Sequence, residues 1–153
     1  MTDLLRKSSD DMMSYEEWFE QHAHKHKKIV DKLVANGYRE DEIIEYFDFE
    51  NMAKEENDFC PLYKDNKKCH DMKTLNCYLC ACPHFRFNDK GIEEKGSKTL
   101  YSFCKVDSKN GKEATYGDSI HKDCSDCNIP HQKAFIKKCF DLDWKNIMRA
   151  CKA

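Results

Sequence analysis

The residues of this chain best suited to chemistry are its cysteines and some of the histidines near them. Eight of the ten cysteines fall within residues 58–131, where two histidines join them as candidates. Thiolate sulfur and imidazole nitrogen are the usual protein ligands of zinc. We therefore expect this segment to bind metal. The candidate ligands are Cys60, Cys69, His70, Cys77, Cys80, Cys82, Cys104, Cys124, Cys127 and His131.

Two cysteine pairs carry the strongest signal. Cys77 and Cys80 stand in CYLC, and Cys124 and Cys127 stand in CSDC. Two intervening residues let both sulfurs of a tight turn reach one ion. We expect these two pairs to share one site, although spacing alone leaves the grouping open. A second site would draw on Cys60, Cys69 or His70, Cys82, Cys104 and His131.

The ligand types favour zinc. Closed tetrahedral sites of cysteine and histidine are typical of structural zinc, and ten candidates suffice for two four-coordinate ions. The alternative is an iron–sulfur cluster. The run CYLCACP at 77–83 places three thiols just before a proline, as some cluster-binding loops do, although its spacing differs from the ferredoxin run.

The remaining cysteines and the N-terminal histidines are expected to lie outside the ligand set. Cys139 and Cys151 fit the apolar faces of C-terminal helices, where a cysteine packs as a small hydrophobe. His22 and His26 fall one helical turn apart, a spacing that suits a metal pair. Lysines surround them, however, so we expect a solvated or half-buried helix face.

Charge and hydropathy exclude several classes of protein. The 153-residue chain has a net charge of −2 and a pI of about 6.4, whereas general nucleic-acid binders carry a basic excess. The N-terminus lacks the basic start and apolar run of a signal peptide, and no stretch approaches the roughly 20 apolar residues that cross a bilayer. We therefore expect a cytoplasmic protein, in which clustered cysteines bind metal rather than form disulfides.

The expected fold class is a small metal-stabilised α+β protein. We expect a flexible tail at 1–13, a helical hairpin at 14–57, a Cys/His metal-binding module of loops and short strands at 58–131, and C-terminal helices packed on it at 132–153. The module holds only nine Ile, Leu, Val or Met in 74 positions. Metal is therefore expected to replace part of a hydrophobic core there.

Local signals predict where the first helices begin and end. Ser14 followed by Glu17 is a capping-box pattern, which satisfies backbone donors at a helix start. Asn36-Gly37 predicts the end of this helix, because glycine adopts the left-handed conformation at no steric cost. A second helix is expected from about residue 39 to Met52.

Fewer signals mark the rest of the chain. Residues 88–98 are expected to form an exposed loop, and the Asn-Gly pair at 110–111 predicts a turn. Pro130 suits the first turn of a helix, since its missing N–H is not needed there. Asp141 or Asp143 is expected to cap a last short helix.

Three stretches resemble a known family. CPLYKDNKKCH (60–70), NCYLCACPHF (76–85) and KDCSDCNIPH (122–131) are similar to the cysteine-rich small domain family, zinc-finger-like metal-binding proteins of bacteria and archaea. The resemblance covers about residues 58–132 and implies metal binding. The gap from Cys60 to Cys69 is longer than in the family pattern, and the helical segments lie outside the match. Some relatives are joined to cobamide-salvage enzymes.

The expected function is that of a structural or protein-interaction module that binds zinc and contacts a protein partner, but neither nucleic acid nor a membrane. The alternative is an iron–sulfur or thiol redox protein that serves a partner enzyme, for instance in cofactor metabolism. The sequence contains no phosphate loop, nucleophile elbow or histidine–glutamate zinc-protease motif. It favours a binding module and leaves catalysis open.

Overall fold

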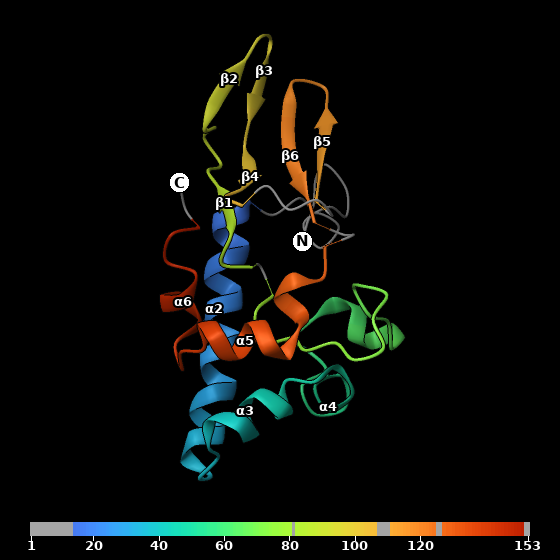
Figure 1. Cartoon of the computed structure of the whole chain (residues 1–153), viewed down its shortest axis with the longest axis vertical. Coiled ribbons are helices and arrows are strands. Elements are labelled where there is room, and N and C mark those ends of the chain that lie inside the picture. The colour runs from blue at the N-terminus through green and yellow to red at the C-terminus, as the bar shows by residue number, and fades with distance from the viewer. Residues whose placement is uncertain (1–13, 81, 107–110, 125–126, 152–153) are drawn as a thin grey trace.

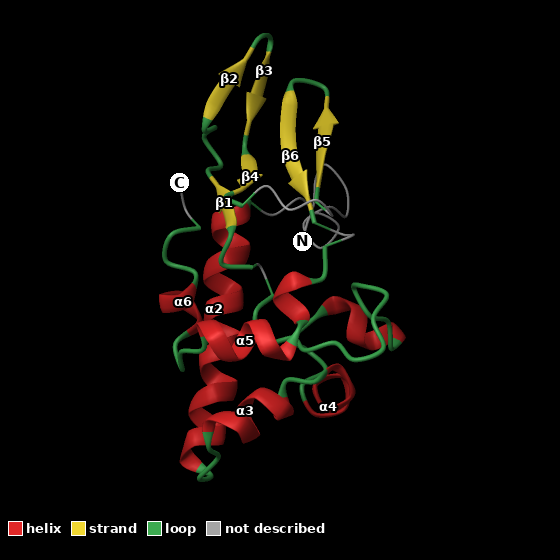
Figure 2. Ribbon diagram, viewed as in Figure 1, coloured by secondary structure: helices red, strands yellow, loops and turns green. Residues whose placement is uncertain are grey.

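The computed structural model describes residues 14–80, 82–106, 111–124 and 127–151. The fold is small and α+β, with N-terminal helices, a central strand module of two sheets and short C-terminal helices. Figures 1 and 2 show two hairpins projecting at one end of the molecule and helices gathered at the other. The predicted tail at 1–13 lies outside the described residues.

The long first helix, α2 (Tyr15–Ala35), begins and ends where its sequence predicts. The Glu17 backbone N–H donates to Ser14 Oγ at 3.1 Å, and that hydroxyl donates to the Glu17 carboxylate at 3.0 Å. At the other end Asn36 is the C-cap and Gly37 follows with φ of 83°, a conformation that favours glycine. Among the described helices, none is long and apolar enough to span a membrane.

The second predicted helix is in fact two short helices, α3 (Glu40–Tyr46) and α4 (Phe49–Glu55). Asp48 is extended between them and forms an antiparallel bridge with Asn76. Phe47 and Phe49 are both buried. Positions two apart point to different sides of a helix, so one continuous helix could not bury both rings. The break lets both reach the core.

The strands form two sheets. Strand β1 (Phe85–Phe87) pairs antiparallel with β4 (Ser102–Cys104). The larger sheet has the order β2-β3-β6-β5, in which the β3–β6 pair is parallel and the other two are antiparallel. Its strands are β2 (Glu93–Lys95), β3 (Lys98–Leu100), β5 (Lys112–Tyr116) and β6 (Ser119–Asp123).

The segments predicted to be a loop at 88–98 and a turn at 110–111 include or border strands of the larger sheet. Residues 88–98 are not simply an exposed loop, because they contain β2 and a turn at Gly96, where φ is 66°. The predicted turn at 110–111 falls partly outside the described residues. The hairpin of β5 and β6 instead turns at Gly117, with φ of 61°.

Short helical pieces complete the chain. They are η1 (Pro61–Asp65) and η2 (Ile129–His131), both 3₁₀ helices, and the α-helices α5 (Lys133–Cys139) and α6 (Trp144–Ile147). Pro130 lies in η2, just before α5. The Lys145 backbone N–H donates to the Asp143 carboxylate at 3.0 Å, which confirms Asp143 as the cap of α6.

One hydrophobic core joins all the helical and Cys/His segments. Phe19 of α2 packs on Trp144 of α6 at a ring-centroid distance of 4.9 Å, and Phe47 packs on Tyr78 at 4.8 Å. Residues 58–131 add two leucines to this core, Leu75 and Leu79, and a larger number of buried aromatic side chains: Phe59, Tyr63, Tyr78, Phe85 and Phe87. The module therefore shares its interior with α2 and α6.

The histidines of α2 are more buried than predicted. His22 is 5% exposed and His26 is 0% exposed, whereas His24 is exposed. His26 packs between Phe47 and Tyr78, and its Nε2 donates to the Tyr78 carbonyl at 3.1 Å. Burial lowers the pKa of His26 to about 3 and also lowers that of His22. Both are therefore neutral core side chains.

These depressed pKa values predict that the protein loses stability in mild acid. The unfolded chain binds a proton at His26 near pH 6.5, but the folded chain does not until about pH 3. The free energy of unfolding should therefore fall as pH drops below 6.5, by roughly 2 kcal/mol between pH 7 and 5 for His26 alone.

Urea unfolding at pH 7 and 5 tests this prediction. The pH dependence should be weaker in His26→Gln, while His24→Gln, a change on the exposed side of the same helix, should leave it unchanged. An equal pH dependence in His26→Gln and the native protein would contradict the argument.

Candidate metal centre

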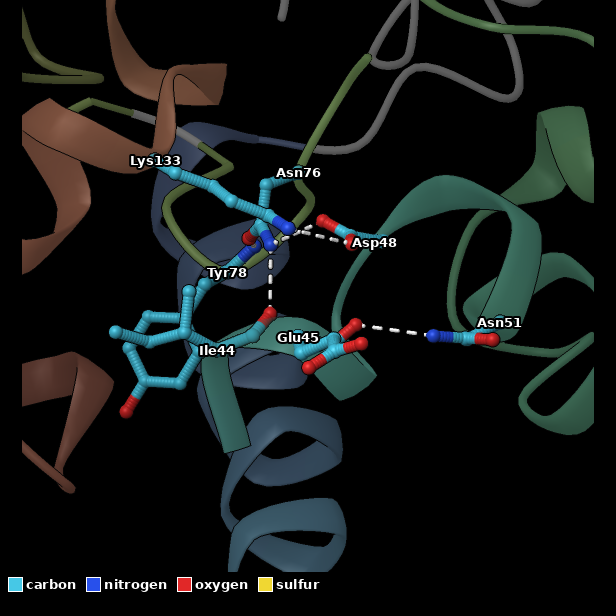
Figure 3. A network of polar contacts seen from close by, with 7 residues as sticks. All are labelled: Ile44, Glu45, Asp48, Asn51, Asn76, Tyr78 and Lys133. Carbon is cyan, nitrogen blue, oxygen red and sulfur yellow. Dashed lines mark hydrogen bonds and ion pairs between the residues drawn. The ribbon is translucent and has the colours of Figure 1, made fainter. Parts of the chain in front are cut away.

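The loop at 76–80 is held by hydrogen bonds from the helices (Figure 3). The buried Asn76 side chain donates to the Ile44 carbonyl at 2.6 Å and to Asp48 Oδ1 at 2.9 Å, and its Oδ1 accepts from the Tyr78 backbone N–H at 2.9 Å. Lys133 of α5 reaches the other Asp48 oxygen at 2.8 Å. Asn76 therefore ties three segments together beside Cys77.

Further contacts orient the rest of this loop. The Cys77 backbone N–H donates to the Phe47 carbonyl at 2.7 Å. The Cys80 carbonyl accepts from the indole of Trp144 at 3.2 Å. Both thiols of the CYLC pair are thereby placed by backbone contacts to helical segments. The sequence shows the pair, but these partners lie far away along the chain.

Cys69, His70 and His131 form a compact group. Their ligand atoms all lie within 4.8 Å of one another, a set that could hold a metal ion. His70 Nδ1 lies 3.0 Å from Cys69 Sγ, and His131 Nε2 lies 3.6 Å from the same sulfur. Sequence reasoning expected only one of the adjacent residues Cys69 and His70 to face a given ion. In the structure both belong to one group of ligand atoms that could hold an ion.

The hydrogen bonds on the far side of each ring determine its tautomer. His131 Nδ1 lies 2.8 Å from the Asn76 carbonyl, and His70 Nε2 lies 2.9 Å from the Cys124 carbonyl. A carbonyl only accepts, so these two nitrogens carry the protons. The nitrogens with lone pairs are then His131 Nε2 and His70 Nδ1, and both face Cys69. Metal-binding histidines are usually held in this way.

The neutral state of the His131 ring also suits metal binding. Burial lowers the pKa of His131 to about 4, so this imidazole is neutral at pH 7. Burial raises the pKa of the Cys69 thiol to about 12, and the neighbouring Cys77 adds to the effect. One thiol proton cannot serve two nitrogen lone pairs, whereas one cation can be shared by the sulfur and both nitrogens.

Most of the other predicted ligands surround one cavity next to this group. Its volume is about 50 Å³, far below the roughly 300–1,000 Å³ of pockets that take organic ligands. The cavity is lined by cysteines 69, 80, 82, 104, 124 and 127 and by histidines 70, 84 and 131. A space of this size with these donors suits ions.

Two predicted ligands, Cys60 and Cys77, are not among the described lining residues of the cavity. Cys60 is the N-cap of η1, and Cys77 is buried beside Cys80 and Tyr63. A hydrogen bond with Cys80 is the main cause that lowers the pKa of Cys77, and a hydrogen bond with Tyr63 lowers it further. Desolvation by burial raises this pKa but does not outweigh the two hydrogen bonds. The ligand roles of these residues, and the expected sharing of an ion by the two C-x-x-C pairs, stay predictions.

The cysteines predicted to be structural lie elsewhere. Cys151 is 1% exposed and contacts Met148 and the Cys82 carbonyl, while Cys139 is half-buried on α5. Sequence reasoning missed the residues that support the site, above all Asn76, Trp144 and the buried Lys122. For Asn76, the sequence did offer a signal, namely its position immediately before the C-x-x-C pair of Cys77 and Cys80.

The chain matches no known family model, no curated protein and no solved structure. The resemblance to the cysteine-rich small domain family therefore stays a prediction. What the structure supports is a cysteine-rich chain with a Cys/His group that could hold a metal.

Removal of the Asn76 side chain should destabilise the protein strongly. Asn76→Ala would leave the Tyr78 backbone N–H without its partner and would remove one of the two hydrogen bonds of the Ile44 carbonyl, which also accepts from the Phe47 N–H at 3.1 Å. The expected cost is about 2–4 kcal/mol in the free energy of unfolding. Denaturant unfolding measures this cost.

The control is Asn51→Ala, because Asn51 is exposed and donates to the Glu45 carbonyl at 3.0 Å (Figure 3). That change should stay within about 0.5 kcal/mol. Equal effects of the two substitutions would contradict the role given to Asn76.

Proposed function

We propose that this protein binds zinc and that the bound metal holds the Cys/His module in shape for contact with a protein partner. The observation that carries the proposal is the geometry of Cys69, His70 and His131. One sulfur and two imidazole nitrogens lie within 4.8 Å of one another. The other nitrogen of each ring is hydrogen-bonded to a backbone carbonyl, which fixes the orientation of the ring.

Cys80 is the best candidate to complete a four-coordinate site. It lines the same cavity as the other three residues, and the pKa of its thiol is raised mainly by Cys77, then by burial, with Cys69 contributing. Closed sites of four cysteine and histidine ligands are the usual structural zinc sites. Cys60 and Cys77 lie near enough to raise the pKa of Cys69 and are the alternatives.

The effect of such an ion would be local and mechanical. Cys69 and His70 lie in a loop without regular structure, and His131 lies in the short η2. An ion between them would tie that loop to the segment that leads into α5. Zinc binding of this kind contributes directly to the stability of a fold.

A protein partner is the contact that this arrangement suits. The hairpins of β2–β3 and β5–β6 project from the rest of the molecule (Figure 1), and nearly all of β2 and β5, the two edge strands, is exposed. Exposed edge strands offer unpaired backbone groups to another chain. The net charge of −2 does not favour nucleic acid.

An iron–sulfur protein is the second candidate. The observation in its favour is the number of thiols, six of which line one small cavity. Iron–sulfur clusters are held by cysteine thiolates, whereas His70 and His131 are better suited to zinc. A redox role beside a partner enzyme would follow from a cluster and not from zinc.

Elemental analysis and a visible spectrum of protein purified without oxygen distinguish these functions. We expect a colourless protein that contains zinc. Cys69→Ser and His131→Gln should each lose one equivalent of zinc and melt at a lower temperature, because each removes a ligand of the same ion.

Cys139→Ser is the matched control, since Cys139 lies outside the group, and it should keep its full metal content. A brown protein with iron would favour the second candidate. Native protein without bound metal would refute both.

A further inference from the structure

The parallel pairing of β3 with β6 brings two distant cysteines to the same level. Thr99 pairs with Ser119 and Leu100 with Ile120, an offset of 20 residues. The same offset continues in β4, where Ser102 Oγ accepts from the Lys122 backbone N–H at 2.7 Å. Side chains two positions apart in a strand share a face. Cys104 and Cys124 each follow this contact by two residues, and both line the same cavity.

Strand β1 brings a third cysteine to this point. Phe85 is the partner of Cys104 in the β1–β4 pair, and its backbone N–H donates to the Cys82 carbonyl at 3.1 Å. Cys82 also has a φ of 58°, which is unusual for a residue other than glycine. Such conformations cost energy and persist where the surroundings require them.

Cys127 completes the set. Its backbone N–H donates to the Cys124 carbonyl at 3.0 Å, which holds these two residues close together. All four thiols line the same cavity. Cys124, Cys104 and Cys127 lie near enough to Cys82 to interact with it electrostatically. The cysteines that lie near Cys69 and Cys80 in this sense include Cys77 and Cys60.

We propose that Cys82, Cys104, Cys124 and Cys127 form a second metal site, closed and made only of thiolates, for a divalent ion of the zinc class. Four sulfur ligands without an open position favour a tetrahedral ion that is held rather than used in catalysis. This proposal rests on the proposed function and adds a second site to it. It also replaces the grouping expected from spacing, because Cys124 and Cys127 join Cys82 and Cys104 instead of Cys77 and Cys80.

Lys122 gives this site a balancing charge. Its residue is 8% exposed and lines the same cavity, and its charge counteracts the rise in the pKa of Cys124. Four thiolates around a divalent ion carry two net negative charges. The positive charge of Lys122, which acts on Cys124, would offset part of that charge. Buried charges in proteins are generally paired.

The test compares zinc content among variants of the full chain. Native protein should contain two equivalents. Cys104→Ser and Cys124→Ser should each lose one and keep the other, while Cys69→Ser should lose the other one. Cys151→Ser is the matched control, because Cys151 is a buried cysteine outside the cavity, and it should keep both.

Cobalt provides a readout of the ligand type. Protein reconstituted with Co²⁺ should show strong sulfur-to-metal charge-transfer absorption. The absorption per ion should be higher in Cys69→Ser than in Cys104→Ser, because Cys69→Ser retains only the all-thiolate site. If Cys104→Ser does not fold, Cys104→His should still bind two ions, with weaker charge-transfer absorption because one sulfur has become an imidazole.

Several outcomes would overturn the proposal. The first is full zinc content in Cys104→Ser. The second is loss of all metal from both Cys104→Ser and Cys69→Ser, which would indicate one shared cluster. The third is a native protein that contains a single equivalent of zinc. In the last case the first site alone accounts for the metal, so the proposed function survives while the second site fails. Absence of all metal from native protein refutes the proposed function itself.

Discussion

The hydrogen bonds of Asn76 determine where two of the candidate metal ligands, Cys77 and His131, lie. Its side chain bonds to the end of α3 and to the start of α4, and its backbone carbonyl accepts from the His131 ring. Its backbone N–H also donates to the His131 carbonyl at 3.1 Å. A buried amide with all its donors and acceptors in use permits few other arrangements. The helical half of the molecule thereby positions Cys77 and His131.

The crowding of buried thiols creates an electrostatic problem that a cation resolves. Burial raises the pKa of Cys69 and Cys82 to about 12 and of Cys124 to about 11, because a thiolate in an apolar setting loses its hydration. Each further thiolate nearby raises the pKa more. A bound divalent ion reverses both effects, since it stabilises the thiolate directly. The proposed two ions would therefore stabilise a part of the chain that cannot carry its sulfurs as free anions.

The proposed metal ions would share the stabilisation of this protein with hydrophobic packing. The few aliphatic residues of the module led to the expectation that metal replaces part of a hydrophobic core there. In the structure its aromatic side chains join the core of the helices. Tyr78 and Phe87 are buried against residues of the helices, such as Phe47 and Phe19. The cavity lies on the other side of the CYLC loop from this packing, since Cys80 lines it while Tyr78 faces the core. Apolar contacts hold one face of that loop, and polar and sulfur groups surround the other.

Much of the fold and of the candidate site was predictable from local sequence. Ser14 and Asp143 cap their helices as expected, and Gly37 follows the end of α2, because a cap depends on residues only two or three positions apart. The concentration of cysteine and histidine in one segment likewise followed from the sequence alone. Local signals failed where burial overrode them, as in the break between Phe47 and Phe49 and in the burial of His22 and His26.

The sequence by itself determined the ligand types, the C-x-x-C spacing and most helix ends, since each depends on neighbours within one turn. Only the tertiary structure decided which ligands meet. The approach of His131 to Cys69 depends on hydrogen bonds across 55 residues, and that of Cys104 to Cys124 depends on the register of a parallel strand pair. Pairings of this kind arise from burial and backbone hydrogen bonding between distant segments, which the spacing of cysteines along the chain does not encode.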